Sequence, residues 1–307
     1  MSFLSEEQIG GVILFEENCP GHNAVRETIR QIRAQYRAST PFVAIDQEGG
    51  RVSRLRGAPA EFRSASDYGA EGSVERFHEE YRRSVVFMES IGINLNLAPV
   101  CDLFLDRKGT CLKERCFGRT PQEVIPFIET SVITARTGKL LSCLKHFPGL
   151  GATSIDPHFK TAVIPYDELV WEQRERLPFA AGVAAGADLI MTTHVRLLGV
   201  DDTIATGSRV IVQDMLRKRL AFDGPVITDD LTMAGAAELG EIGPRTVRAF
   251  NAGHEILLFG RDYEQSMRAY DYFVDAYRHG DISRDRVEEA LGRVSGVKFK
   301  LDSVMLP

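Results

Sequence analysis

Short apolar runs alternate with longer amphipathic segments along almost the whole chain. The seven apolar runs, each short enough to be a single strand, are Gly11–Phe15, Phe42–Ile45, Ile93–Val100, Leu140–Leu144, Leu189–Thr193, Pro225–Thr228 and Glu255–Phe259. The intervening segments have the charge-rich pattern of amphipathic helices and are Ala24–Arg37, Val74–Ile91, Pro121–Thr137, Leu169–Ala185, Val210–Leu220, Pro244–Ala252 and Tyr263–Arg278. Strands that alternate with helices predict a parallel sheet covered by helices. Because no Ser/Pro-rich linker or change of composition divides the chain, we expect residues 1–307 to form a single domain.

Polar residues that chemistry can use follow at least five of these runs. They are Asp46-Gln47-Glu48, Asp102, Lys145-His146, His194 and Asp229-Asp230. In a (β/α)8 barrel the active site is assembled from the carboxyl ends of many strands, whereas an open α/β sheet uses only its switch point. Helix capping could explain a single aspartate, but not His194 or a Lys-His pair. The pattern therefore predicts an α/β fold of the (β/α)8 TIM-barrel type.

An eight-stranded barrel needs one strand more than the seven runs supply. Residues Ser5-Glu6-Glu7 have the pattern of a helix start and lead directly into Gly11–Phe15. We therefore expect the first strand of the barrel to be missing or displaced.

Composition excludes several classes of function. The net charge is −6 and no basic block is present, so nothing favours nucleic acid or an anionic membrane as a partner. No run approaches the ~18 apolar residues of a membrane span, and the first residues lack the features of a signal peptide. Five cysteines, odd in number and without CxxC spacing, indicate free thiols in a reducing cytoplasm. With no HExxH, CxxC, His-x-His or phosphate-binding loop, we expect neither a metal nor a cofactor.

The densest group of polar residues lies between Lys145 and His158. Lys145 and His146 end an apolar run, Gly149 and Gly151 permit a sharp turn, and Asp156-Pro157-His158 follows. A carboxylate two residues from an imidazole suggests a proton-transfer pair, in which the Asp orients the His. This stretch is therefore the predicted catalytic loop.

Other strand ends supply candidate binding and catalytic groups. The acidic groups after Phe42–Ile45 can accept hydrogen bonds from sugar hydroxyls, and a solvated βα turn is the alternative. Glu114-Arg115 could donate to hydroxyl or amide oxygens, or form a surface pair. His194 is a cleft residue or a core histidine, and one carboxylate of Asp229-Asp230 can serve as a nucleophile while its neighbour caps a helix.

Four ordered motifs together resemble glycoside hydrolase family 3, in particular its single-domain bacterial β-N-acetylglucosaminidases of peptidoglycan recycling. They are Phe42-Val-Ala-Ile-Asp-Gln-Glu-Gly-Gly-Arg-Val52, Lys145-His-Phe-Pro-Gly149, Asp156-x-His158 and Ile227-Thr-Asp-Asp-Leu-Thr-Met233. The resemblance extends from about Gly11 to about Phe259.

The resemblance implies a retaining glycosidase that acts on a small carbohydrate substrate. Asp229 would be the nucleophile, with His158 as general acid/base and Asp156 as its orienting partner. The sugar-binding positions implied by the family are Asp46, Arg54, Arg115, Lys145 and His146, with His194 in the same mouth. We expect a monomer or a weak homo-oligomer.

Two positions depart from the family pattern. Leu150 stands where the family has a second His, and Pro157 stands where it has Ser, which biases Asp156 toward an extended conformation and removes one N–H. A β-glucosidase or phosphorylase of the same family, or a sugar-binding barrel without catalytic activity, are the alternative functions.

Overall fold

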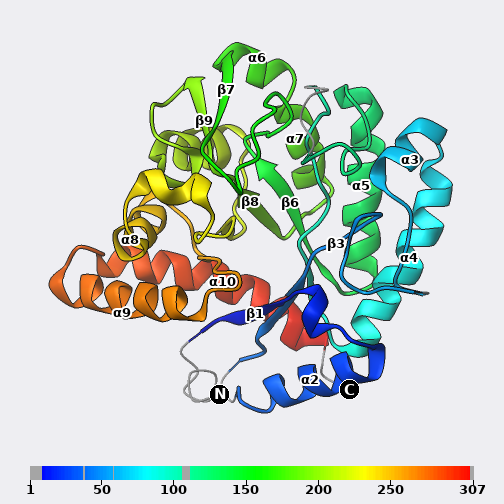
Figure 1. The fold of residues 1–307 in the computed structure, drawn as a ribbon, viewed down its shortest axis with the longest axis horizontal. Helices are drawn as coiled ribbons and strands as arrows, with labels where there is room; N and C mark the ends of the chain where they lie inside the picture. The colour runs from blue at the N-terminus through cyan, green and yellow to red at the C-terminus, as the bar shows by residue number, and fades with distance from the viewer. Residues whose placement is uncertain (1–8, 37–38, 58, 106–110, 305–307) are drawn as a thin grey trace.

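The curled parallel sheet at the centre of the protein is seen in a computed structural model that describes residues 9–36, 39–57, 59–105 and 111–304 (Figure 1). Its six strands, in hydrogen-bonded order, are β1 (Gly11–Leu14), β2 (Phe42–Ile45), β5 (Leu95–Asn96), β6 (Leu141–Phe147), β8 (Leu189–Thr192) and β10 (Val226–Thr228). Every pairing in this sheet is parallel. The predicted α/β class and parallel sheet are therefore confirmed.

The sheet has the form of a curled half-barrel, and six of the seven predicted runs are its strands. The seventh run, Glu255–Phe259, joins β10 through one isolated parallel bridge between Ile227 and Ile256. In the described residues the hydrogen-bonded order ends at β1 on one side and β10 on the other. The helix start expected at Ser5–Glu7 lies outside the described residues.

The strands are buried on both faces, which explains why they read as short continuous apolar runs. Side chains alternate between the two faces, because successive residues of a strand point in opposite directions. Phe42 and Ala44 of β2 face the inside of the curl, together with Leu97 and Met191, whereas Val43 packs outward in the main core beneath the helices.

Helices surround the sheet, most of them on its outside (Figure 1). They are α2 (His22–Arg33), α3 (Ala65–Glu71), α4 (Val74–Ile91), α5 (Pro121–Thr137), α6 (Glu168–Gln173), α7 (Arg176–Ala184), α8 (Ile242–Ala252), α9 (Tyr263–His279) and α10 (Arg284–Val304), with short 3-10 helices η1 (Glu16–Asn18), η2 (Ala205–Gly207) and η4 (Ala234–Leu239) and a π-helix, η3 (Val210–Arg219). The single helix predicted over Leu169–Ala185 divides into α6 and α7. Pro178 accounts for this break, because a proline cannot donate to, and clashes with, the carbonyl four residues earlier, at Arg174.

Several strands and helix α10 were not predicted from the sequence. A hairpin of β3 (Gln47–Gly49) and β4 (Val52–Ser53) follows β2, and β7 (Ala162–Asp167) pairs with β9 (Val195–Gly199) in a separate two-stranded sheet. Helix α10 returns to the open side of the curl, where Val297 and Leu301 pack with the inward-facing strand residues. Lys300 of α10 also pairs with Asp188 at the start of β8, with Nζ and Oδ1 2.8 Å apart.

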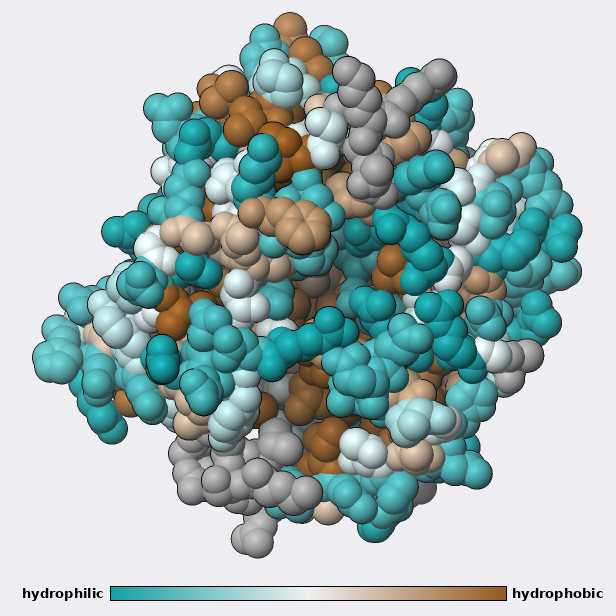
Figure 2. Space-filling model, viewed as in Figure 1, coloured by the Kyte–Doolittle hydropathy of each residue, from teal (hydrophilic) through white to brown (hydrophobic). Residues whose placement is uncertain are grey.

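The face of the protein drawn in Figure 2 is predominantly hydrophilic. It includes several apolar groups, one of which lies over β7 and β9 at the top of the view, and Leu198 of β9 is half exposed. No helix in the described part of the chain is both long and apolar enough to cross a bilayer.

Candidate active site

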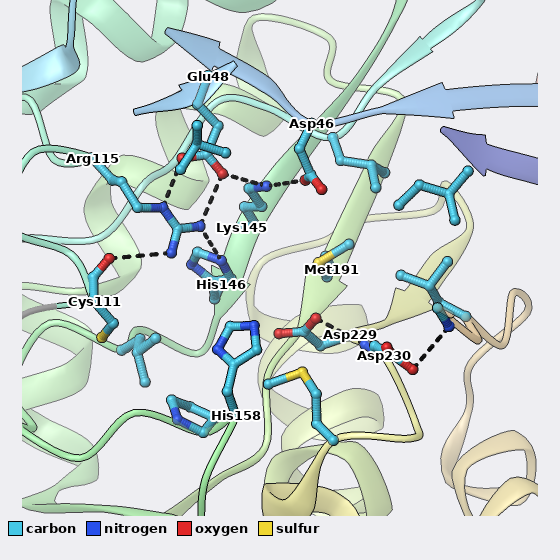
Figure 3. Close-up of a pocket in the computed structure, with 18 of the residues that line it drawn as sticks. Asp46, Glu48, Cys111, Arg115, Lys145, His146, His158, Met191, Asp229 and Asp230 are labelled. Atoms are coloured by element: carbon cyan, nitrogen blue, oxygen red, sulfur yellow. Dashed lines mark hydrogen bonds and ion pairs between the residues drawn. The ribbon is translucent and has the colours of Figure 1, made fainter. Parts of the chain in front are cut away.

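A pocket of about 270 Å³ lies at the carboxyl ends of the strands. Its walls bring together side chains from the central strands and from the loops that follow them, and Figure 3 shows how they converge. The lining residues include Asp46, Glu48, Arg54, Arg115, Lys145, His146, Leu150, Asp156, Pro157, His158, Met191, Asp229 and Asp230. Eight of the nine predicted site residues therefore meet in one pocket.

Lys145 forms the centre of a buried charge network. Its Nζ lies 2.7 Å from Asp46 Oδ1 and 2.6 Å from Glu48 Oε1, with the Lys145 side chain only 3% exposed. Burial by itself lowers the pKa of Lys145, but the carboxylates of Asp46 and Glu48 outweigh it and raise the net pKa. Lys145 therefore stays protonated and is held as a fixed cation at the end of β6.

Arg115 joins this network from the loop that follows β5. Its Nε and Nη2 donate to the two oxygens of Glu48 at 2.7 and 2.9 Å, and Nη2 also donates to His146 Nε2 at 3.0 Å. Burial would raise the pKa of Glu48, but the charges of Arg115 and Lys145 hold it well below its usual range. Glu48 is thus an ionised carboxylate that orients two cations toward the pocket.

His146 is fixed as one neutral tautomer by its two neighbours. A guanidinium has no acceptor, so His146 Nε2 presents its lone pair to Arg115 and the ring proton sits on Nδ1. That Nδ1–H donates to Asp102 Oδ2 at 2.6 Å. Asp102 Oδ1 accepts from Leu150 N–H at 2.6 Å, so the same carboxylate also fixes the turn that follows β6.

Arg54 reaches the pocket on a loop organised by Gln47. The buried Gln47 amide accepts from the N–H groups of Arg54 and Leu55, and it donates to Ser53 and two carbonyls. Arg54 Nη2 lies 3.4 Å from Asp46 Oδ2. Gly49 has no room for a side chain, because a Cβ there would overlap the carbonyl oxygen of Arg63.

Asp229 projects into the pocket from the residue directly after β10. Its N–H donates to the carbonyl of Thr192 at 2.9 Å, and its Oδ1 accepts from the N–H of Asp230 at 2.8 Å. Burial raises the pKa of Asp229, whereas the hydrogen bond from the Asp230 N–H lowers it, and the net pKa is below the ordinary value. In Figure 3 the other carboxylate oxygen points toward His146 and His158.

Asp156 and His158 form a second Asp–His pair at the pocket, in addition to Asp102 and His146. Asp156 Oδ1 accepts from both the backbone N–H and the ring Nδ1 of His158, at 3.0 and 2.7 Å. Because the carboxylate holds Nδ1–H, the Nε2 atom is left for proton exchange. The His158 side chain is 63% exposed, so it lies at the open side of the pocket with access to solvent.

His194 is not on the pocket wall, contrary to the expectation that it shares the mouth. It is completely buried, with Nδ1 2.7 Å from Thr206 Oγ1 and Nε2 2.9 Å from the carbonyl oxygen of Asp230. It lies two positions after the end of β8, directly before β9.

Leu150 and Pro157, the two residues that depart from the family pattern, are both buried in the pocket wall. Leu150 contributes an apolar surface and the N–H bound by Asp102. The carbonyl of Pro157 accepts from Gly235 N–H at 2.9 Å, which attaches the Asp156–His158 loop to the loop after β10. This attachment uses no atom that proline lacks.

Glu48 and Asp102 belong to the site but were not among the predicted site residues. The sequence contains features that could have identified both residues. Glu48 is two residues from Asp46 and so lies on the same side of an extended chain, and Asp102 follows an apolar run. Within the described residues, no group of three His, Cys, Asp or Glu side chains has the arrangement of a metal site.

Comparison with known proteins identifies relatives of this arrangement. Residues 1–297 match the model of the glycosyl hydrolase family 3 N-terminal domain. The chain is 33% identical over 267 residues to a β-hexosaminidase of Stenotrophomonas maltophilia, covering 83% of this chain and 77% of that protein. It is 29% identical to β-hexosaminidase A of Pseudoalteromonas piscicida, where it spans 97% of this chain but 54% of that protein.

Solved structures agree with these matches. The structure of a family 3 β-N-acetylglucosaminidase from Paenibacillus sp. superposes with a TM-score of 0.95 at 27% identity, covering all of this chain and 59% of that one. A β-N-acetylhexosaminidase from Beutenbergia cavernae superposes with a TM-score of 0.90 at 28% identity, covering 97% and 91% of the two chains. This chain therefore spans little more than half of some relatives and almost all of others.

Proposed function

This chain belongs to glycosyl hydrolase family 3, and from that premise we propose that it is a retaining β-N-acetylglucosaminidase. Its substrates would be small peptidoglycan- or chitin-type fragments with a terminal β-linked N-acetylglucosamine. The observation that carries this proposal is the placement of the Asp156–His158 dyad and the Asp229 carboxylate in one pocket, beside a fixed network of charged hydrogen-bonding groups. The names of the β-hexosaminidase relatives support the choice of sugar.

In the first step, the free carboxylate oxygen of Asp229 attacks the anomeric carbon. The glycosidic C–O bond breaks, and the departing oxygen takes the proton from Nε2 of His158. Asp156 stabilises the imidazolium through Nδ1 before the transfer. The lowered pKa of Asp229 keeps this group ionised and ready to attack at neutral pH.

In the second step, water releases the sugar from Asp229. His158 Nε2, now neutral, takes a proton from the water as its oxygen attacks the anomeric carbon, and the bond to Asp229 breaks. Two inversions give net retention of configuration. The exposure of His158 supports this step, because the same ring must meet first a leaving group and then water.

The charged network would hold the non-reducing sugar. Lys145, Arg115 and Arg54 offer hydrogen-bond donors, and Asp46 offers acceptor oxygens. Sugar hydroxyls can both donate and accept, so donors and acceptors in one pocket suit them. Since each of these groups is already paired with another, they are preorganised and lose little freedom on binding.

We also infer the finer features of fold and setting that the family suggests. The sheet would be a (β/α)8-type barrel that lacks one strand, with the packing of α10 into the open side in support. The enzyme would act in the cytoplasm on peptidoglycan-recycling fragments, a setting that fits the five free cysteines.

A panel of aryl β-glycosides, assayed with and without phosphate, tests the proposal. We expect the enzyme to prefer the N-acetylglucosaminide over the glucoside and the xyloside, with rates that phosphate does not change. NMR of the reaction should show the β-anomer of N-acetylglucosamine as the first product, before it equilibrates with the α-anomer. A requirement for phosphate would instead indicate a phosphorylase, which a neutral or cationic acid/base permits because it does not repel phosphate. Absence of turnover on every glycoside would indicate a sugar-binding protein.

A further inference from the structure

His194 does not line the pocket, yet its Nε2 faces the segment that carries Asp229. Its Nε2 lies 2.9 Å from the carbonyl oxygen of Asp230, and its side chain is completely buried. Burying an imidazole destabilises a protein unless both ring nitrogens form hydrogen bonds. The two hydrogen bonds of His194 are therefore what make a histidine acceptable at this buried position.

The neighbours of His194 determine its tautomer. A carbonyl oxygen can only accept, so Nε2 carries the proton and donates to Asp230. Burial lowers the pKa of His194, which favours the neutral ring with a lone pair on Nδ1. The hydroxyl of Thr206, 2.7 Å away and also fully buried, then donates to Nδ1 in preference to the carbonyl of Thr193, which is farther away at 3.3 Å.

Asp230 transmits this constraint to the nucleophile. Its N–H donates to Asp229 Oδ1, its carbonyl accepts from His194, and its own Oδ1 accepts from Thr232 N–H, Thr232 Oγ1–H and Gly260 N–H at 2.7 to 3.0 Å. The N–H, the carbonyl and the Oδ1 atom of Asp230 are therefore all held. The direction of the N–H that binds Asp229 depends on all these contacts together.

We propose that His194 is a positioning residue for the nucleophile: its Nε2–H fixes the Asp230 peptide, and through it the rotation of the Asp229 carboxylate. Thr206 assists by holding the tautomer that can donate. With Oδ1 bound, Oδ2 is aimed into the pocket. The inference rests on the proposed function, in which Asp229 attacks the sugar.

Two matched pairs of variants test this role. His194→Gln can place an amide N–H near the position of Nε2–H, whereas His194→Leu cannot donate. Thr206→Ser keeps the hydroxyl, whereas the isosteric Thr206→Val removes it. Each variant is assayed as the full chain with an activated aryl N-acetylglucosaminide, so that protonation by His158 matters little and kcat/KM reports attack by Asp229.

A nucleophile misplaced by a fraction of an ångström should slow attack without weakening sugar binding. We expect kcat/KM to fall about 10- to 100-fold in His194→Leu and less in Thr206→Val. His194→Gln and Thr206→Ser should stay within about threefold of wild type. The inhibition constant of free N-acetylglucosamine should be unchanged in all four variants.

Other outcomes would overturn the assignment. A raised inhibition constant in His194→Leu would mean that His194 contacts the sugar, and unchanged kcat/KM in His194→Leu would mean that the contact to Asp230 is dispensable. If His194→Leu does not fold, the Thr206 pair decides: equal rates in Thr206→Val and Thr206→Ser would refute the tautomer argument. Wild-type protein without any glycosidase activity would instead refute the proposed function itself.

Discussion

Glu48 accepts two hydrogen bonds from the guanidinium of Arg115, at 2.7 and 2.9 Å, although the two residues are 67 positions apart in the chain. The same carboxylate lies 2.6 Å from Lys145 Nζ, so one buried anion serves two cations. This arrangement makes Glu48 the anion that holds both cations of the charged network in place.

Glu48→Gln should lower the free energy of unfolding by about 3–5 kcal/mol, because it leaves buried cations without their counter-charge. Urea denaturation at neutral pH measures the change. The neighbouring surface variant Glu114→Gln is the control and should change stability by no more than about 0.5 kcal/mol. Similar values for the two variants would show that the network does not contribute to stability.

Asp229→Ala should reduce kcat by about 10⁴-fold or more, because it removes the proposed nucleophile. Hydrolysis of an aryl N-acetylglucosaminide provides the measurement, with the exposed Asp271→Ala on α9 as control. Added azide should restore turnover and give the α-configured glycosyl azide. A β-configured azide product would argue against Asp229 as the nucleophile.

His158→Ala should impair turnover mainly for substrates with poor leaving groups. An activated aryl group departs without protonation, whereas a sugar leaving group needs the proton of Nε2. The comparison of kcat/KM for an activated aryl glycoside and a disaccharide measures this difference. Equal losses on both substrates would contradict the acid role.

Pro157→Ser should change kcat while the free energy of unfolding falls by no more than about 1 kcal/mol. The attachment to Gly235 uses the backbone carbonyl of Pro157 and survives the substitution. Thermal unfolding and steady-state kinetics, with the exposed Pro165→Ser as a control, separate the two effects. A variant that unfolds would mean that the proline is needed to build the loop.

Acid should destabilise the protein through His254, which is completely buried with Nδ1 2.8 Å from the carbonyl of Ala249 and Nε2 2.8 Å from Thr192 Oγ1. Burial lowers the pKa of His254 to about 3, against about 6.5 in the unfolded chain. A group whose pKa is lowered by folding contributes stability that is fully present above pH 6.5 and lost as the pH falls toward 3. The cost is about 1.4 kcal/mol per pH unit in this window.

His254→Asn removes this titration and should flatten the decline. Urea denaturation at pH 7.5, 6 and 5 measures the slope for both proteins, and the variant should lose about one proton's worth of pH dependence. An unchanged slope in His254→Asn would assign the acid sensitivity to other groups.

Much of the fold could be predicted because its signals are local. The runs Phe42–Ile45 and Pro225–Thr228 and the helices Val74–Ile91 and Pro121–Thr137 have periodicities that neighbouring residues alone produce. Helix α10 could not be placed this way, because its position depends on an opening in a sheet whose strands come from the whole chain.

The sequence by itself determined the α/β class, the parallel sheet and the location of reactive groups at the carboxyl ends of strands, since these follow from short-range patterns and from the geometry of parallel strands. Only the tertiary structure decided how those groups pair. It placed Glu48 between Arg115 and Lys145, bound Asp102 to His146, and turned His194 away from the pocket to the peptide beside Asp229. These pairings depend on contacts between residues far apart in the chain, where burial and charge, rather than local propensity, decide which polar atoms must meet.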